Sequence, residues 1–193
     1  MRVYGDLRSG NCLKVKWTAD ALGRPYIWQS VDIMAGDTRT ADYLARFPMG
    51  QVPAIELDDG RTLAQSNAII RYLARGSRLI PADPFAEAEM DQWLFWEQYS
   101  HEPYIAVCRF HMLYQGKPKQ AREDWRVARG EQALDPMERT LGRRPWFAGT
   151  DVSLADIALL GYTRVAPEGG FDLGERVKVR DWIGRCERAL GIS

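Results

Sequence analysis

The stretch Phe47-Pro48-Met49-Gly50-Gln51-Val52-Pro53-Ala54 decides how the first third of the chain is interpreted, because it places a proline directly before an apolar strand. Proline has no amide hydrogen and is disfavoured inside a strand ladder. A cis Val52-Pro53 bond would turn the backbone so that Val52 offers its amide and carbonyl to an extended peptide. An ordinary trans proline at a sheet edge is the alternative, since only about 5 to 6% of X-Pro bonds in folded proteins are cis.

Short strands and helices alternate around this stretch. Apolar, aromatic or β-branched runs predict four strands, at residues 2–4, 26–33, 54–57 and 62–64. Apolar residues at helical spacing predict three helices, at residues 12–22, 40–47 and 66–74. Asp58-Asp59-Gly60 is a turn signal between the last two strands and predicts a hairpin. The order βαβαββα therefore predicts an α/β domain over residues 1–75.

The remainder of the chain has a different character. Residues 76–84 contain Pro81 and Pro84 and predict a linker, after which strand signals almost disappear. Helices are expected at residues 86–102, 104–113, 121–141, 154–165 and 177–190. We expect Pro103 to break or kink the first of them. Residues 85–193 therefore predict a second, all-helical domain.

Composition excludes several functional classes. Among the 193 residues, 26 are Lys or Arg and 26 are Asp or Glu, so no net charge favours nucleic acid or an anionic membrane. The chain shows neither a signal peptide nor a membrane-spanning segment, and its three cysteines suit a reducing compartment. We therefore expect a cytoplasmic protein. With two histidines and no paired cysteines, no metal site is expected.

The segment Ser9-Gly10-Asn11-Cys12 joins the first strand to its helix, where unpaired amides and the helix dipole favour negative charge. A Ser9 hydroxyl that donates to a ligand sulfur would stabilise the thiolate and lower the thiol pKa. Asn11 is a rival donor from the same loop. Ser9 could instead be only a helix cap, and Cys12 a small buried hydrophobe.

The segment Gln65-Ser66-Asn67 follows a strand and opens a helix in the same way. Backbone amides and the Ser66 hydroxyl could hold a carboxylate, and the Gln65 amide could reach an α-amino group. The plain alternative is that Ser66 caps the helix.

Taken together, Val52-Pro53-Ala54-Ile55 and Gln65-Ser66-Asn67-Ala68-Ile69 resemble the glutathione-binding core of soluble, cytosolic-type glutathione transferases. Ser153-Leu154-Ala155-Asp156 is similar to the capping box of that family's central helix, in which Asp156 would be a fold determinant. The resemblance covers nearly the whole chain. It implies a thioredoxin-like first domain, an all-helical second domain, and an enzyme that conjugates glutathione to small electrophiles. A hydroxyl at position 9 resembles the serine-type classes of the family, and we expect a bacterial-like member.

The same resemblance assigns roles to individual residues. Ser9, with Asn11 as its rival, would stabilise the thiolate, and Val52 would pair with the cysteinyl backbone beside a cis Pro53. The remaining assignments are Gln65 and Ser66 for the γ-glutamyl end, and Gln51 and Arg39 for the glycyl carboxylate. The family often has an acidic residue where this chain has Gln65.

The electrophile pocket is expected between the domains, with Trp96, Tyr99 and Tyr104 as candidate lining residues. Nearby polar residues, His101, Glu102 and Arg109, could serve either the pocket or a structural network. The resemblance also implies a homodimer with a role in detoxification. Two alternatives remain for function: a non-catalytic binding or regulatory module of the same fold, or a glutathione-dependent disulfide or peroxide reductase or isomerase.

Overall fold

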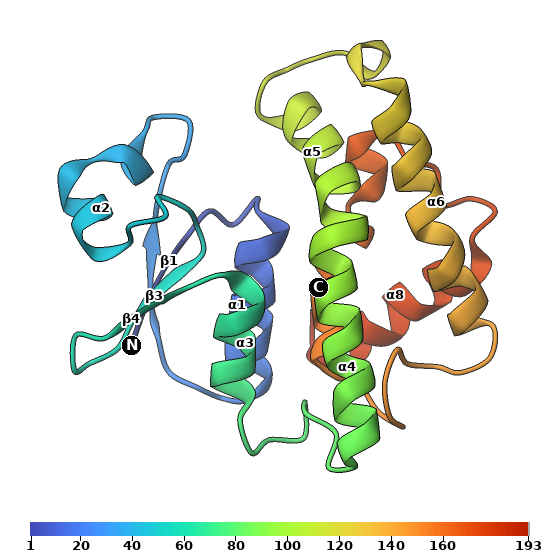
Figure 1. Ribbon diagram of the computed structural model, residues 1–193, viewed down its shortest axis with the longest axis horizontal. Helices are drawn as coiled ribbons and strands as arrows, with labels where there is room; N and C mark the ends of the chain where they lie inside the picture. Colours follow the sequence, from blue (N-terminus) through green and yellow to red (C-terminus); the bar gives the residue numbers. More distant parts are fainter. Residues whose placement is uncertain (193) are drawn as a thin grey trace. The chain divides into compact units, whose positions relative to one another are not determined.

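The computed structural model describes residues 1–192, in which the chain forms two compact units (Figure 1). The first unit comprises residues 1–77, and the second begins at Arg78. The division therefore falls inside the segment 76–84 that the sequence predicts as a linker.

The first unit is an α/β structure. Its elements are β1 (Arg2–Gly5), α1 (Gly10–Ala21), β2 (Ile27–Ser30), the 3-10 helix η1 (Asp37–Arg39), α2 (Ala41–Arg46), β3 (Ala54–Glu56), β4 (Thr62–Ala64) and α3 (Ser66–Ala74). The predicted βαβαββα order is confirmed. Only β2 and α1 have a boundary that differs from the prediction by more than one residue. β2 is shorter because it pairs only with the four residues of β1, and α1 begins two residues earlier because Ser9 caps it.

The sheet has the strand order β2-β1-β3-β4, with β1 and β2 parallel and the other pairs antiparallel. Figure 1 shows α1 and α3 on one face of this sheet and α2 on the other. Side chains alternate along β1, so Val3 and Tyr4 face opposite layers. Tyr4 packs with Val31, Tyr43, Phe47 and Ala54 in a hydrophobic cluster, which we call the α2 cluster. The arrangement is the expected thioredoxin-like fold.

In its described residues the second unit contains helices and no strand, as predicted. Its elements are α4 (Pro84–Trp96), the π-helix η2 (Glu97–His101), α5 (Glu102–Leu113), the 3-10 helix η3 (Lys119–Ala121), α6 (Asp124–Leu141), α7 (Leu154–Thr163), the 3-10 helix η4 (Ala166–Gly169) and α8 (Val177–Leu190). Pro84 belongs to α4, where Asp83 caps the helix and the missing proline amide is not needed. Pro103 lies in the first turn of α5 for the same reason. The interruption expected at Pro103 appears as the π-helical turn just before it.

The capping box predicted at the start of α7 is confirmed. Asp156 is fully buried and accepts hydrogen bonds from Ser153 N and Oγ (both 3.0 Å), Phe147 N (3.2 Å) and Trp182 Nε1 (2.9 Å). Burial raises the pKa of Asp156, and the donors from Ser153, Trp182 and Phe147 act against that rise. One carboxylate thus ties the start of α7 to α8 and to the preceding loop.

Residues 1–192 lack two features that would bear on function. None of their helices has the length and apolar character needed to cross a membrane. The same residues contain no group of three or more His, Cys, Asp or Glu side chains that could hold a metal ion.

Candidate functional site

The turn after β1 is fixed by an aspartate that the sequence interpretation did not single out. The Asp6 carboxylate accepts hydrogen bonds from Arg8 N (2.9 Å) and Nε (3.1 Å), and it pairs with Arg8 Nη2 at 2.9 Å. The Asp6 carbonyl also accepts from Ser9 N at 2.9 Å. An Asp followed two residues later by Arg, directly after a strand, is the local signal that could have identified this turn. The turn places Ser9 at the start of α1.

Ser9 occupies the N-cap position of α1, with its Oγ 3.4 Å from the amide nitrogen of Cys12. In this contact Ser9 accepts a hydrogen bond, so the helix-cap interpretation is correct for this atom. Accepting uses an oxygen lone pair and leaves the hydroxyl proton to be donated elsewhere. The cap and a donor role toward sulfur are therefore compatible.

Cys12 lies one turn into α1 and is fully buried. Burial raises the pKa of its thiol to about 11, and the hydrogen bond from the Ser9 side chain opposes this rise only in part. A thiol with such a pKa is overwhelmingly protonated near neutral pH, so Cys12 behaves as a core residue. The interpretation of Cys12 as a small buried hydrophobe fits the structure.

The sheet topology brings Ser66 to Asn11. Ser66 is the first residue of α3 and is 5% exposed, and its Oγ donates a hydrogen bond of 3.1 Å to Asn11 Oδ1. The amino termini of α1 and α3 are therefore adjacent. The amino end of each helix carries a partial positive charge, which favours an anionic ligand.

The segment before β3 contains the predicted cis peptide bond, between Val52 and Pro53. Pro53 is buried, and the partly buried Val52 side chain packs against the α2 cluster. The Gln51 carbonyl oxygen accepts a hydrogen bond of 2.8 Å from the hydroxyl of Tyr43, in α2. In the sequence, Tyr43 is only one residue of the helix predicted at 40–47, because nothing in the local pattern reveals this contact eight residues away.

Gln65 and Gln51 also meet. Gln65 Nε2 donates to Gln51 Oε1 at 3.1 Å and lies 3.3 Å from the sulfur of Met49. Gln65 precedes α3 with φ 70° and ψ 112°, and it is the one non-glycine residue with positive φ in the described chain. Positive φ is costly for a residue with a side chain and is most often retained at functional sites.

Arg39 lies beside the same segment. A Cβ built on Gly50 would come within 2.6 Å of Arg39 Nη1, so the guanidinium packs closely over this glycine. The Arg39 side chain is exposed, and no described residue forms an ion pair with it. Its charge is thus available next to Gln51.

The second unit holds the residues predicted for the electrophile pocket. Tyr99 is 82% exposed, and Tyr104 packs edge-on against Trp125 at a ring-centroid distance of 6.3 Å. Trp96 packs against Trp93 at 5.2 Å and against His101 at 6.1 Å. Contact of these aromatic residues with an electrophile stays a prediction.

Two of the polar residues near Pro103 belong to structural networks. The His101 ring is buried, with Nε2 2.9 Å from Thr163 Oγ1. Arg109 is also buried and forms an ion pair of 2.7 Å with Glu168. The structural alternative therefore applies to His101 and Arg109.

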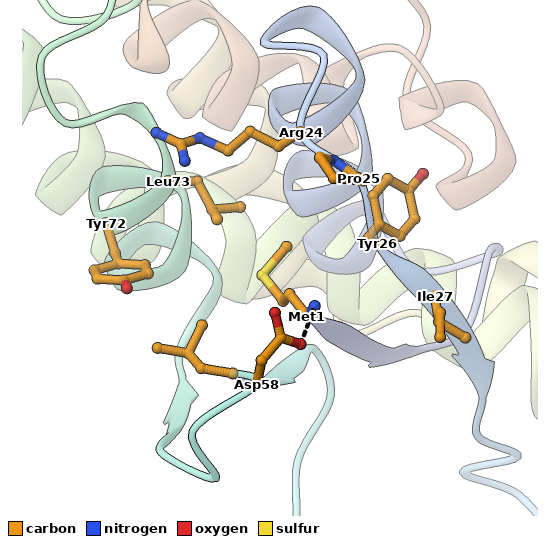
Figure 2. A pocket seen from close by; sticks show the side chains of 9 residues that line it. Met1, Arg24, Pro25, Tyr26, Ile27, Asp58, Tyr72 and Leu73 are labelled. Atoms are coloured by element: carbon orange, nitrogen blue, oxygen red, sulfur yellow. Dashed lines mark hydrogen bonds and ion pairs between the residues drawn. The ribbon is translucent and has the colours of Figure 1, made fainter.

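A separate cavity of about 360 Å³ lies at the other end of the first unit (Figure 2). Met1 precedes β1 and Asp58 follows β3, whereas Ser9 follows β1 and Val52 precedes β3, so the two regions occupy opposite ends of the sheet. The residues lining this cavity are Met1, Arg24, Pro25, Tyr26, Ile27, Leu57, Asp58, Tyr72 and Leu73. None of them is a predicted site residue. Figure 2 shows the ion pair of 2.7 Å between the Met1 amine and Asp58 within it.

Comparisons with known proteins agree with the fold of both units. The family model for the glutathione S-transferase N-terminal domain matches residues 8–75, and the model for the glutathione S-transferase C-terminal domain matches residues 95–189. Glutathione S-transferase 3 of Zea mays is 30% identical over 194 aligned positions, which cover 94% of this chain and 86% of that protein.

Solved structures of similar proteins have the same fold as this chain. A glutathione S-transferase from Pseudomonas fluorescens Pf-5 is 50% identical with a TM-score of 0.92, covering 96% of this chain and 94% of that one. A possible glutathione S-transferase from Rhodopseudomonas palustris is 42% identical, also with a TM-score of 0.92, covering 97% and 94%. The chain therefore belongs to the glutathione S-transferase family, whose members use glutathione as a co-substrate and conjugate it to electrophiles.

Proposed function

We propose that the first unit binds glutathione along the residues around Val52 and the amino termini of α1 and α3, with Ser9 as the group that stabilises the thiolate. The observation that carries this proposal is the hydrogen bond between Ser66 and Asn11, because it joins the two helix termini at which an anion is favoured. In this assignment the sulfur lies at the start of α1, and the γ-glutamyl carboxylate at the start of α3.

The thiolate is activated by solvation rather than by a base. The Ser9 hydroxyl donates a hydrogen bond to sulfur, and the positive end of α1 adds a favourable field, so the pKa of the glutathione thiol falls and its proton passes to solvent. The thiolate then attacks the electrophilic carbon and forms a carbon–sulfur bond. The leaving group departs with its electron pair, as chloride does from 1-chloro-2,4-dinitrobenzene.

The remaining contacts orient the tripeptide. The amide and carbonyl of Val52, next to cis Pro53, pair with the cysteinyl backbone. Ser66 and the first amides of α3 hold the γ-glutamyl carboxylate, and the Gln65 amide reaches the α-amino group. Gln51 addresses the glycyl carboxylate by hydrogen bond, and the exposed Arg39 addresses it by charge.

We propose further that the protein is a serine-type, bacterial-like member of the family that acts as a cytoplasmic homodimer in detoxification. The hydroxyl at position 9 supports the serine-type assignment. Three large side chains along α4 and η2, those of Phe85, Phe95 and Tyr99, are 75%, 76% and 82% exposed and offer a face for a second copy. The Zea mays relative and the Pseudomonas fluorescens structure that the chain matches are glutathione S-transferases, which favours the transferase over the non-catalytic and reductase alternatives.

The deciding experiment is a pH titration of bound glutathione followed by the ultraviolet absorbance of its thiolate, in the native protein, Ser9→Ala and Asn11→Ala. We expect the native protein to lower the thiol pKa by one unit or more, and Ser9→Ala to abolish most of that shift. If only Asn11→Ala abolishes it, Asn11 takes the role assigned to Ser9. If the native protein leaves the thiol pKa unchanged, the activation mechanism is wrong.

A further inference from the structure

A buried tyrosine lies directly behind the main-chain segment that the proposed site offers to glutathione. The Tyr43 hydroxyl donates a hydrogen bond of 2.8 Å to the carbonyl oxygen of Gln51, the residue before Val52. Tyr43 is 4% exposed, so this bond forms at the edge of the core and little water competes for it. At the other end of the residue, Tyr43 N donates to Thr40 Oγ1, the N-cap of α2, at 3.3 Å.

The Tyr43 ring is itself fixed in place. It packs edge-on against Tyr4 at a centroid distance of 6.4 Å and tilted against Phe47 at 4.9 Å. The side chain of Val52 packs against the same α2 cluster. The cluster thus holds the segment at two successive residues, through the carbonyl of Gln51 and through the side chain of Val52.

The geometry of the peptide unit fixes the direction of the Val52 N–H as well. The carbonyl of Gln51 and the amide N–H of Val52 belong to one planar peptide unit, and in a trans unit they point in opposite directions. The cis bond lies one residue later, between Val52 and Pro53. Because Tyr43 holds the Gln51 carbonyl toward the α2 cluster, the Val52 N–H must point away from it.

The Tyr43 hydroxyl does not lose its proton at the pH values at which such an enzyme works, so the hydrogen bond to Gln51 persists. Burial raises the pKa of Tyr43 to about 12. The phenol therefore keeps its proton and its donor role across the pH range in which the glutathione thiol ionises.

We propose that Tyr43 is a positioning residue for glutathione, which orients the Gln51–Val52 peptide unit so that the Val52 amide meets the cysteinyl carbonyl of the tripeptide. This inference rests on the proposed function of Val52. Tyr43 touches neither glutathione nor the electrophile, so it acts on the affinity for glutathione and not on the chemical step.

The test is Tyr43→Phe, which removes the hydroxyl and keeps the ring. With 1-chloro-2,4-dinitrobenzene as electrophile, we expect the KM for glutathione to rise roughly three- to tenfold, the usual effect of losing one hydrogen bond. The kcat at saturating glutathione should change by less than a factor of about two, and the pKa of the bound thiol should shift by no more than a few tenths of a unit.

Tyr4→Phe is the matched control, because it removes a hydroxyl from the same cluster. The Tyr4 hydroxyl donates to Glu56 at 2.7 Å and accepts from Arg46 at 2.7 Å, away from the Gln51 carbonyl. We expect Tyr4→Phe to leave the KM for glutathione unchanged even where it lowers the melting temperature. An equal KM effect in both variants, or no KM effect in Tyr43→Phe, overturns the inference.

Two further measurements separate this inference from its premises. If Tyr43→Phe folds poorly, amide hydrogen exchange measured below its melting temperature replaces the kinetic test. We expect the substitution to speed exchange at residues 50–52 more than in α1. An equal increase in both segments contradicts the inference. Ser66→Ala tests the proposed site independently. A loss of glutathione affinity in Ser66→Ala but not in Tyr43→Phe leaves the proposed function intact and removes only the role of Tyr43.

Discussion

Ser66 Oγ donates to Asn11 Oδ1 at 3.1 Å, which links two helix amino termini that are 55 residues apart in the sequence. The contact orients the Asn11 amide, because accepting through Oδ1 turns Nδ2 the other way. The sequence left Ser9 and Asn11 as rival donors because both side chains stand at the start of α1. The hydrogen bond to Ser66, at the start of α3, distinguishes Asn11 from Ser9.

This link predicts that Asn11 and Ser66 act as a unit. Asn11→Ala and Ser66→Ala should each weaken glutathione binding by about 1 to 2 kcal/mol, but the double variant should lose clearly less than the sum, because each single change already breaks the shared bond. Isothermal titration of glutathione into the four proteins measures the coupling. Strict additivity would mean that the hydrogen bond makes no contribution to binding.

Replacing Gln65 by Glu should strengthen glutathione binding. A carboxylate there would face the α-amino group of the ligand, and the Gln51 amide could turn its nitrogen toward it, replacing the present bond at 3.1 Å. We expect a gain of about 0.5 to 1 kcal/mol that shrinks with added salt. Titration at low and high ionic strength checks this. A glutathione analogue without the α-amino group should show no gain, and an equal gain for that analogue would contradict the assignment.

Gly50 and Gly60 form a matched pair for backbone substitution. Both have positive φ, at +57° and +83°, but a Cβ on Gly50 would meet Arg39 Nη1 at 2.6 Å and the Thr38 carbonyl at 3.1 Å, whereas nothing lies within 4 Å at Gly60. Gly60→Ala should lower the free energy of unfolding by about 1 kcal/mol, from backbone strain alone. Gly50→Ala should cost about 2 to 3 kcal/mol in urea unfolding and should also raise the KM for glutathione. Equal losses of unfolding free energy in the two variants would show that the segment around Gly50 rearranges to accommodate the added methyl group.

Asp156→Ala should be among the most destabilising single changes in the second unit. It leaves the buried donors Phe147 N and Trp182 Nε1 without their acceptor, for an expected loss of about 3 kcal/mol or more. The exposed Asp181, in α8, is the control, and Asp181→Ala should change stability by less than about 0.5 kcal/mol. Urea unfolding of both variants at pH 7 makes the comparison, and similar losses would contradict the structural role of Asp156.

The same carboxyl also predicts a pH dependence. Burial raises the pKa of Asp156 above its unfolded value of about 3.9, so the native state binds this proton more tightly than the unfolded state does. Its contribution to stability therefore falls as the pH rises from about 4 through the native pKa. The stability difference between native protein and Asp156→Ala should accordingly be larger at pH 4 than at pH 7.

Phe95→Glu tests the proposed dimer. A charge on the exposed face near the carboxyl end of α4 should weaken association of two copies and shift the protein toward monomer in sedimentation velocity. Trp125→Glu, on α6 and 54% exposed in the native protein, is the control and should leave the assembly unchanged. A native protein that sediments as a monomer at micromolar concentration would refute the proposed homodimer directly.

The sequence by itself determined the order of elements, the change from an α/β unit to a helical one, the capping box of Asp156 and the family. These features depend on residues close together in the chain, such as the apolar spacing of residues 66–74, which predicts α3 with both boundaries correct. It also singled out Val52-Pro53 as a candidate cis bond, but local pattern alone could not choose between cis and trans.

Only the tertiary structure decided which candidates meet. The bond between Ser66 and Asn11 exists because β3 pairs antiparallel with both β1 and β4. The strands β1 and β4 therefore end at the same edge of the sheet, where α1 and α3 begin. The hold of Tyr43 on Gln51 and the burial of Cys12 likewise depend on how α2 and α1 pack on opposite faces of the sheet. Periodicity and caps are set by neighbours in the chain, whereas these contacts and pKa shifts are set by packing between distant segments, which no local pattern encodes.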